Sequence, residues 1–194
     1  MKTFYTDFSV ELTEALNCTR STYKGKDISA DQAMDIWADE THRIAQNNGT
    51  IFLAGNGASA TMAEHFGTDA MKNGKLKTIN FSETSYLTAI SNDISYDAVF
   101  LLKLERFGNP GDMLITISSS GNSPNIVNAI KYAKENKIFC TTLSAMKPDN
   151  RSRKFGDLAF YVPAKTYGIA ESAHSAVLHC WLDTYLDKYL GGRQ

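Results

Sequence analysis

Apolar side chains recur at helical spacing near the start of the chain. Phe4, Phe8 and Leu12 are four residues apart, and Leu16 continues the stripe by one more turn. This spacing predicts an amphipathic helix over residues 2 to 20 with an aromatic face. An apolar stripe of this kind needs a surface on which to be buried.

A second helix is predicted after the break at Gly25. Ser29 and Gln32 have the spacing of a capping box, in which a serine and a glutamine satisfy free backbone N–H groups at a helix start. Apolar residues continue at helical spacing to about residue 46, and the pair Asn48-Gly49 ends the pattern. We therefore expect two N-terminal helices within residues 1–47.

From residue 50 onward, short apolar runs alternate with helical patterns. The runs predict five strands, at residues 51–53, 78–81, 113–117, 138–143 and 158–162. Helices are predicted between and after them, at residues 58–71, 85–90, 96–107, 124–135 and 170–190. Such alternation indicates an α/β fold with a doubly wound, five-stranded parallel sheet. We expect a single domain, residues 1–194, with its α/β body at 50–190.

Composition and charge exclude several classes of function. The chain is 43% hydrophobic and carries 20 Lys plus Arg against 21 Asp plus Glu, so there is no net positive field to attract nucleic acid. No apolar run reaches the roughly 20 residues that span a bilayer, and we expect a cytoplasmic protein with no membrane partner. Cys18, Cys140 and Cys180 are odd in number and form no CxxC pair, so we predict packing roles for them.

The turn after the third predicted strand is crowded with hydroxyls. Four serines occupy six positions, namely Ser118, Ser119, Ser120 and Ser123, and Pro124 then suits the first turn of a helix. In open parallel sheets ligands bind beyond the carboxyl ends of the strands. Helix N–H groups and serine hydroxyls can hold a phosphate there without Lys or Arg. Simple N-capping is the alternative, but it needs a single serine.

The turn after the first predicted strand is a second candidate. It reads Gly-Asn-Gly-Ala-Ser-Ala over residues 55–60, and we take Asn56, Gly57 and Ser59 as candidate substrate-binding residues. The same letters match GxGxxA, and Glu83 follows at about the distance expected for a ribose contact, so dinucleotide binding is an alternative. A second, serine-rich anion turn fits a phosphorylated small molecule better than it fits a pyrophosphate.

Four ionisable residues on two helices are candidates for chemistry. His65 and Asp69 share one helix face, whereas Glu171 and His179 are eight residues apart, about 12 Å along a helix axis. Two histidines and two carboxylates suit either a divalent metal or proton transfer. Solvated helix charges and buried core histidines are the alternatives. For a shared site, either the last helix begins after Glu171 or a neighbouring chain completes the site.

The motifs GNGAS at residues 55–59, SND at 91–93 and GDMLITISSSGNSPNIVNAI at 111–130 resemble the sugar isomerase (SIS) domain family, and within it the phosphoheptose isomerases. The resemblance runs from the N-terminal helices to about residue 190. It implies a flavodoxin-like sheet that binds sedoheptulose 7-phosphate and converts this ketose to the aldose. It also implies a homotetramer with active sites between subunits, which serves heptose synthesis for lipopolysaccharide or capsule.

The resemblance also implies roles for individual residues. The serines of the turn and Ser59 would hold the phosphate, while Asn56 and Asp93 would face the sugar. Asp69 stands where the family has a glutamate base, and His179 would move a proton between oxygens. Glu171 replaces a family glutamine as a substrate-binding residue. Some family members bind zinc at the positions of His65, Asp69, Glu171 and His179, so Zn²⁺ is an expected cofactor.

These observations favour an aldose–ketose isomerase that acts on a phosphorylated sugar through an enediolate. Two other classes remain open. One is a non-catalytic SIS protein that binds a sugar phosphate or a replication initiator protein, which would not need the four ionisable residues. The other is an isomerase or epimerase of a nucleotide-sugar or antibiotic pathway. His42 and His174 are interpreted as structural, since neither is tied to a candidate turn.

Overall fold

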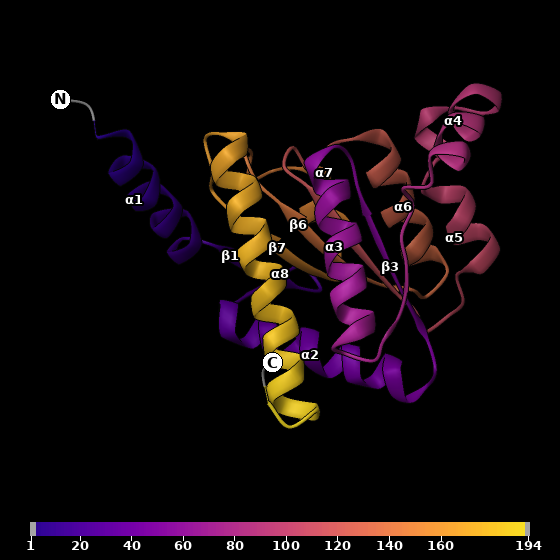
Figure 1. The fold of residues 1–194 in the computed structure, drawn as a ribbon, viewed down its shortest axis with the longest axis horizontal. Helices are drawn as coiled ribbons and strands as arrows, with labels where there is room; N and C mark the ends of the chain where they lie inside the picture. Colours follow the sequence, from indigo (N-terminus) through magenta and orange to yellow (C-terminus); the bar gives the residue numbers. More distant parts are fainter. Residues whose placement is uncertain (1–2, 193–194) are drawn as a thin grey trace.

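A single sheet with helices on both faces forms the body of the protein in the computed structural model, which describes residues 3–192 (Figure 1). The strands are β1 (Arg20–Tyr23), β2 (Lys26–Ile28), β3 (Thr50–Gly55), β4 (Lys77–Ile79), β5 (Met113–Ser118), β6 (Phe139–Ser144) and β7 (Leu158–Tyr161). The helices are α1 (Phe4–Asn17), α2 (Ala30–Gln46), α3 (Ala58–Lys72), α4 (Thr84–Asp93), the 3-10 helix η1 (Tyr96–Ala98), α5 (Leu101–Phe107), α6 (Pro124–Glu135), α7 (Arg151–Phe155) and α8 (Tyr167–Tyr189).

The five predicted parallel strands are confirmed, and two further strands extend the sheet. The order is β2-β1-β7-β6-β5-β3-β4, in which β4, β3, β5, β6 and β7 pair in parallel. The connections between these strands place their carboxyl ends along one edge. The order reverses between β3 and β5, and this is where the two serine-bearing turns lie.

The strands β1 and β2 were not predicted, because Gly25 looked like a simple break between two helices. They form an antiparallel hairpin that pairs Ser21 with Ile28, and β1 then adds antiparallel to β7. Lys24 and Gly25 both have positive φ, 49° and 77°, as a two-residue hairpin turn requires. The sequence signal was the Lys-Gly pair alone, because the two strands beside it are short and show no alternation of buried and exposed positions.

Two layers of helices cover the sheet, as the doubly wound prediction requires. Successive residues of a strand point to opposite faces, so Ile51 and Leu53 join the cluster under α2, α3 and α8, whereas Phe52 and Ala54 join the cluster under α5 and α6. In Figure 1 the first of these layers, with α8 and α3, lies in front of the strands. The capping box at the start of α2 is confirmed in both of its hydrogen bonds.

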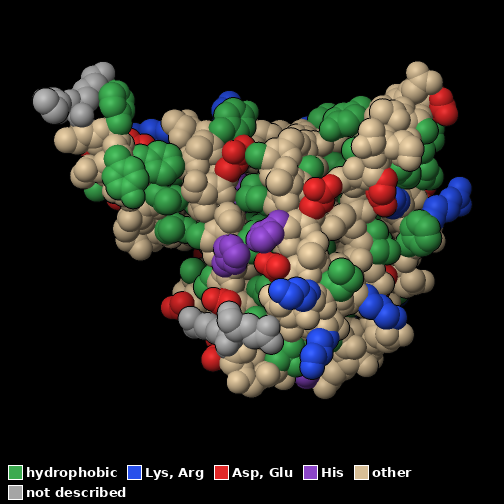
Figure 2. Space-filling model, in the orientation of Figure 1, with side chains coloured by type: hydrophobic (Ala, Val, Ile, Leu, Met, Phe, Trp, Pro, Cys, Tyr) green, Lys and Arg blue, Asp and Glu red, His purple; other side chains and the backbone are tan. Residues whose placement is uncertain are grey.

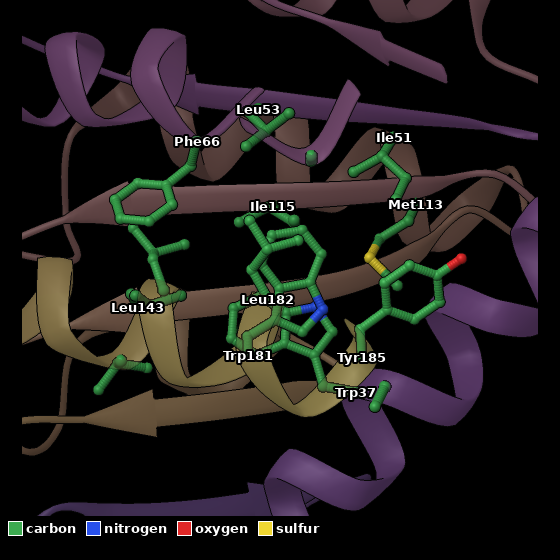
Figure 3. Close-up of a cluster of buried hydrophobic side chains, with 14 of the residues drawn as sticks. Trp37, Ile51, Leu53, Phe66, Met113, Ile115, Leu143, Trp181, Leu182 and Tyr185 are labelled. Atoms are coloured by element: carbon green, nitrogen blue, oxygen red, sulfur yellow. The ribbon is translucent and has the colours of Figure 1, made fainter. Parts of the chain in front are cut away.

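Two stacked tryptophans join the long helix α8 to α2 (Figure 3). The rings of Trp37 and Trp181 have centroids 4.7 Å apart and are inclined by 12°. The indole Nε1 of Trp181 donates to Oγ1 of Thr41 at 2.9 Å, so the polar edge of this ring is satisfied inside the core. This contact fixes the position of α8, which carries two of the candidate site residues.

Several local expectations need correction. The helix expected over residues 96–107 is divided into η1 and α5, and the short helix α7 was not predicted. Cys140 is buried as expected, but Cys18 and Cys180 are exposed and therefore are not core packing residues. None of the helices described here combines the length and the apolar character needed to cross a bilayer. The first helix was predicted to begin at residue 2, which lies outside the described residues.

The helix α1 extends away from the body and leaves its aromatic face open (Figures 1 and 2). Tyr5 is 87% exposed and Phe8 42% exposed, and Ala15 is the buried residue of this helix. Burial of such a stripe would be favourable by about 25 cal/mol per Å² of apolar surface. The amphipathic pattern is thus confirmed: Leu12 and Leu16 pack against the core beside Ala15, whereas the aromatic part of the face, at Tyr5 and Phe8, is open.

Candidate active site

The serine turn forms one wall of the site at the carboxyl end of β5. Ser118 ends the strand and Pro124 begins α6. Ser123 is the N-cap of α6, yet its side chain makes no capping hydrogen bond, so simple N-capping does not account for this serine. The hydroxyls of Ser118 and Ser120 accept bonds from loop N–H groups at 3.2 Å and keep their own protons for donation.

Contacts from α7 fix the shape of this turn. The carbonyl of Gly121 accepts from the N–H and the hydroxyl of Ser152, each at 2.9 Å. Gly121 has φ of +61°, and a Cβ there would lie 2.2 Å from Oδ1 of Asn150. Any larger residue would therefore collide with the side chain of Asn150. The turn is therefore held in place before any ligand arrives.

The turn after β3 forms the opposite wall. A Cβ on Gly55 would lie 2.4 Å from the carbonyl oxygen of Ser59, so the glycine lets α3 begin directly against the strand. Gly57 is the N-cap of α3 with φ of +57°. The side chain of Ser59 is consequently placed in the first turn of α3, where the N–H of Ser59 bonds to the carbonyl of Asn56 and the positive end of the helix dipole favours an anion.

The two turns and α8 enclose a small cavity of about 190 Å³. Its lining consists of Asn56, Ser59, Ile117, Ser118, Ser119, Ser120, Ser123, Tyr167 and Glu171. The structure thus brings together the four serines of the turn and three more of the predicted substrate-binding residues. Gly57 shapes the wall without lining it, and Asp93 lies outside the cavity at the end of α4. We did not predict Tyr167, because an aromatic residue at a helix start carries no motif.

The lining of this cavity contains a carboxylate and no Lys or Arg. Glu171 is half-buried, and its carboxylate has neither a hydrogen bond nor an ion pair among the described residues. Any anion bound to the serines would therefore be held by neutral donors and helix termini, with Glu171 facing other parts of the ligand.

A second group of candidate residues lies on the neighbouring surface of α3 and α8. Nε2 of His65 is 3.3 Å from Oδ2 of Asp69, one turn away on α3. The imidazole of His179 stacks edge-on against Phe66, with centroids 4.6 Å apart, and lies 6.0 Å from the ring of His65. Figure 2 shows two histidine side chains together near the centre of the molecule, with an acidic side chain beside them.

The four proposed metal ligands do not converge in one chain. Helix α8 begins at Tyr167, so the expectation that it might begin after Glu171 is wrong. Glu171 and His179 are then about 12 Å apart along a continuous helix. Among the described residues no three His, Cys, Asp or Glu side chains are placed to hold a metal ion. Within one chain, the arrangement therefore fits a zinc ion poorly.

Two further residues lie outside the cavity: Glu83 pairs with Lys103, whereas both ring nitrogens of His174 are without a hydrogen-bond partner among the described residues. The carboxylate of Glu83 accepts from Nζ of Lys103 at 2.5 Å, and this hydrogen bond lowers the pKa of Glu83. His174 is fully buried on α8, and burial lowers its pKa to about 4. Glu83 is thus engaged in an ion pair, and His174 is a neutral core residue as we expected.

Larger hollows exist elsewhere but do not gather the candidate residues. One of about 640 Å³ lies at the amino-terminal edge of the sheet, between Arg43, Lys77 and Asp112. Another of about 520 Å³ lies between α1 and the start of α8. Because ligands of parallel sheets bind at the carboxyl edge, we assign the site to the smaller cavity.

Comparisons with known proteins identify the family to which this chain belongs. A family model for the SIS domain matches residues 20–142. The phosphoheptose isomerase of Aromatoleum aromaticum is 36% identical over 145 residues, covering 71% of this chain and 73% of that protein. That of Helicobacter pylori is 36% identical over 145 residues, covering 71% and 74%. The solved structure of phosphoheptose isomerase GmhA from Neisseria gonorrhoeae matches with a TM-score of 0.80 at 27% identity, over 94% of this chain and 95% of that one.

A mostly parallel sheet with a serine turn and two helix amino termini around one cavity defines a phosphosugar-binding α/β protein. The chain belongs to the SIS domain family and, within it, to the phosphoheptose isomerases. The protein is therefore an isomerase and not a purely regulatory SIS protein.

Proposed function

We propose that the protein interconverts sedoheptulose 7-phosphate and the corresponding aldose heptose 7-phosphate. The observation that carries the proposal is the cavity of serine hydroxyls on β5 and α6, with Asp69, His65 and His179 on the adjoining surface. Membership of the phosphoheptose isomerases supports the choice of a seven-carbon substrate.

The phosphate is held at the serine turn in this proposal. The hydroxyls of Ser59, Ser119 and Ser123 make no hydrogen bond with any other described residue and can donate to a ligand. The amino termini of α3 and α6 add N–H groups and the positive ends of two helix dipoles. Neutral donors hold the dianion without placing a fixed positive charge beside the sugar.

Proton transfer is assigned to the residues on α3 and α8. Asp69 takes a proton from C1 of the ketose and returns it to C2, so that an enediolate forms between the two steps. His179 takes the proton from the hydroxyl on C1 and delivers it to the oxygen on C2. The aldose and the ketose are therefore isomers with the same atoms. His65, 3.3 Å from Asp69, orients that carboxylate.

Removal of the base tests this assignment. Asp69→Asn keeps the size of the side chain and should lower kcat by about 10² to 10⁴, the usual contribution of a positioned general base. Exchange of solvent deuterium into recovered ketose should fall in parallel. Glu64→Gln on the exposed side of α3 is the matched control and should keep full activity. Undiminished turnover and exchange in Asp69→Asn would overturn the role of Asp69.

We also propose zinc binding as a property of the assembled protein. His65 and Asp69 lie 3.3 Å apart and the ring of His179 lies 6.0 Å from that of His65. Because no three of these side chains are placed to hold a metal within the described residues, a second chain would have to supply ligands, Glu171 among them. A bound zinc would polarise the carbonyl and hydroxyl oxygens of the sugar. The acid–base steps above do not depend on it.

A homotetramer with active sites at its interfaces completes the proposal. The side chain of His65 is 58% exposed in one chain, although an enediolate benefits from exclusion of water. The open aromatic face of α1 offers an apolar surface for a second copy. A neighbouring chain would thus bury α1 and cover the acid–base residues.

A further inference from the structure

Two asparagines behind the cavity form a reciprocal amide pair. Nδ2 of Asn56 donates to Oδ1 of Asn125 at 3.1 Å, and Nδ2 of Asn125 donates to Oδ1 of Asn56 at 3.0 Å. Asn125, in the first turn of α6, is 1% exposed, while Asn56, in the turn after β3, lines the cavity. The pair joins the two turns that hold the proposed ligand.

One backbone group fixes the direction of every bond in this pair. The N–H of Ile126 donates to Oδ1 of Asn125 at 2.9 Å, so this atom must be the amide oxygen. The nitrogen of Asn125 is then the atom that faces Asn56, and Asn56 must offer its oxygen in return. Turning the amides over would oppose the N–H of Ile126 with an NH₂ group, which is unfavourable in a buried place.

This direction determines what Tyr96 can do. The hydroxyl of Tyr96, on η1, lies 2.8 Å from Oδ1 of Asn56, and because that atom is an acceptor the tyrosine must donate its only proton there. Both acceptor positions of Asn56 are then filled, and one N–H of Asn56 remains. The oxygen of Tyr96 keeps its lone pairs but has no proton left for a ligand.

Tyr96 lies where a ligand can reach it. Tyr96 is 53% exposed, and its hydroxyl touches a residue of the cavity lining. It follows closely on Asp93, which we expected to face the sugar. A sugar extending out of the serine cavity past Asn56 would meet the phenol oxygen at the rim.

We propose that Tyr96 is a specificity residue that accepts a hydrogen bond from a hydroxyl of the substrate sugar, while Asn56 acts toward the ligand as a donor alone. The inference rests on the proposed function, because the bound ligand must be a sugar phosphate. In this inference Asn125 is a positioning residue: it touches no ligand, and it determines which atoms of Asn56 and Tyr96 donate and which accept hydrogen bonds.

The first test compares two ligands on one variant. Tyr96→Phe removes the acceptor oxygen and should weaken binding of sedoheptulose 7-phosphate by about 3- to 10-fold, the effect of one neutral hydrogen bond. Calorimetric binding of inorganic phosphate should stay unchanged, because phosphate alone does not reach the rim. Tyr86→Phe is the matched control, since it loses a tyrosine hydroxyl bond to the carbonyl of Val99, in the turn between η1 and α5. That control should bind both ligands as the native protein does.

The second test identifies the hydroxyl. Native protein should bind one of the monodeoxy analogues of sedoheptulose 7-phosphate more weakly by a similar factor, and Tyr96→Phe should bind that analogue and the parent sugar equally. This loss of discrimination separates a sugar contact from a general effect on folding. Equal affinities for the parent sugar in Tyr96→Phe and native protein, or equal discrimination in both, would overturn the inference. Failure of native protein to bind any sugar phosphate would instead overturn the proposed function.

Discussion

The imidazoles of His65 and His179 face each other across α3 and α8, with ring centroids 6.0 Å apart and planes inclined by 72°. Asp69 touches the first of these rings. The proposed base and the proposed proton shuttle therefore stand on either side of His65 within one chain. This differs from a site in which the two come from different chains, and it changes what a mixing experiment should show.

Mixed oligomers of two inactive variants should stay inactive. Asp69→Ala and His179→Ala remove residues that act on one surface of one chain, so refolding the two together leaves every site with one defect. The measurement is isomerase activity in oligomers verified to contain both variants. Recovered activity would show that these residues meet across an interface.

Loss of the serine hydroxyls should weaken binding of the phosphate. Ser119→Ala combined with Ser120→Ala should cost about 1 to 2 kcal/mol for each hydrogen bond lost to the anion. Calorimetric titration with the sugar phosphate measures the change. Ser172→Ala, next to Glu171 but absent from the cavity lining, is the matched control. Unchanged affinity in the double variant would remove these serines from the site.

Stability should fall in mild acid because of His174. The pKa of the His174 imidazole falls from 6.5 to about 4 on folding. Between these two pH values the unfolded chain therefore binds a proton at His174, whereas the folded chain does not. The stabilisation is complete above pH 6.5 and is lost as the pH falls toward 4. Between pH 7.5 and 5 we expect a loss of about 2 kcal/mol, measurable by urea unfolding.

Two histidine variants isolate this contribution. His174→Leu should flatten the decrease over the same pH range, because it has no proton to bind. His42→Gln, which removes an imidazole stacked on Tyr189 at the surface, should keep the decrease. An unchanged pH dependence in His174→Leu would assign the effect to other groups.

Substitutions on the open face of α1 should break the assembly. Tyr5→Ser with Phe8→Ser alters side chains that contribute little to the fold of one chain, since both are exposed. If α1 is buried between copies, sedimentation should show a shift from tetramers to smaller species. A native protein that sediments as a monomer, or an unaltered tetramer in the double variant, would contradict the role of α1.

Zinc can be tested apart from activity. Protein purified without a histidine tag should contain zinc, and added zinc should raise the Tm of chelated protein. The variant His179→Ala should lose both effects, whereas His42→Gln should keep them. Absence of zinc together with full activity after chelation would leave acid–base catalysis by Asp69 and His179 alone.

Much of the fold could be predicted because its elements carry local signals. Four of the five parallel strands are short runs buried on both faces, and the helix start at Ser29 is marked by its capping box. The hairpin of β1 and β2 was missed since its strands are short and mixed in polarity. Its place beside β7 depends on a pairing distant in sequence, which no local pattern records.

The candidate site divides in the same way. The sequence alone determined the serine turn, the glycine turn and the helical spacing of His65 and Asp69, because each depends on neighbours within one turn of chain. The tertiary structure decided that Glu171 belongs with the serines and His179 with His65, since a straight α8 carries the two residues to different places. It also decided the direction of the bonds from Ile126 through Asn125 to Tyr96, because a buried amide has no water to exchange with and must match the donors around it.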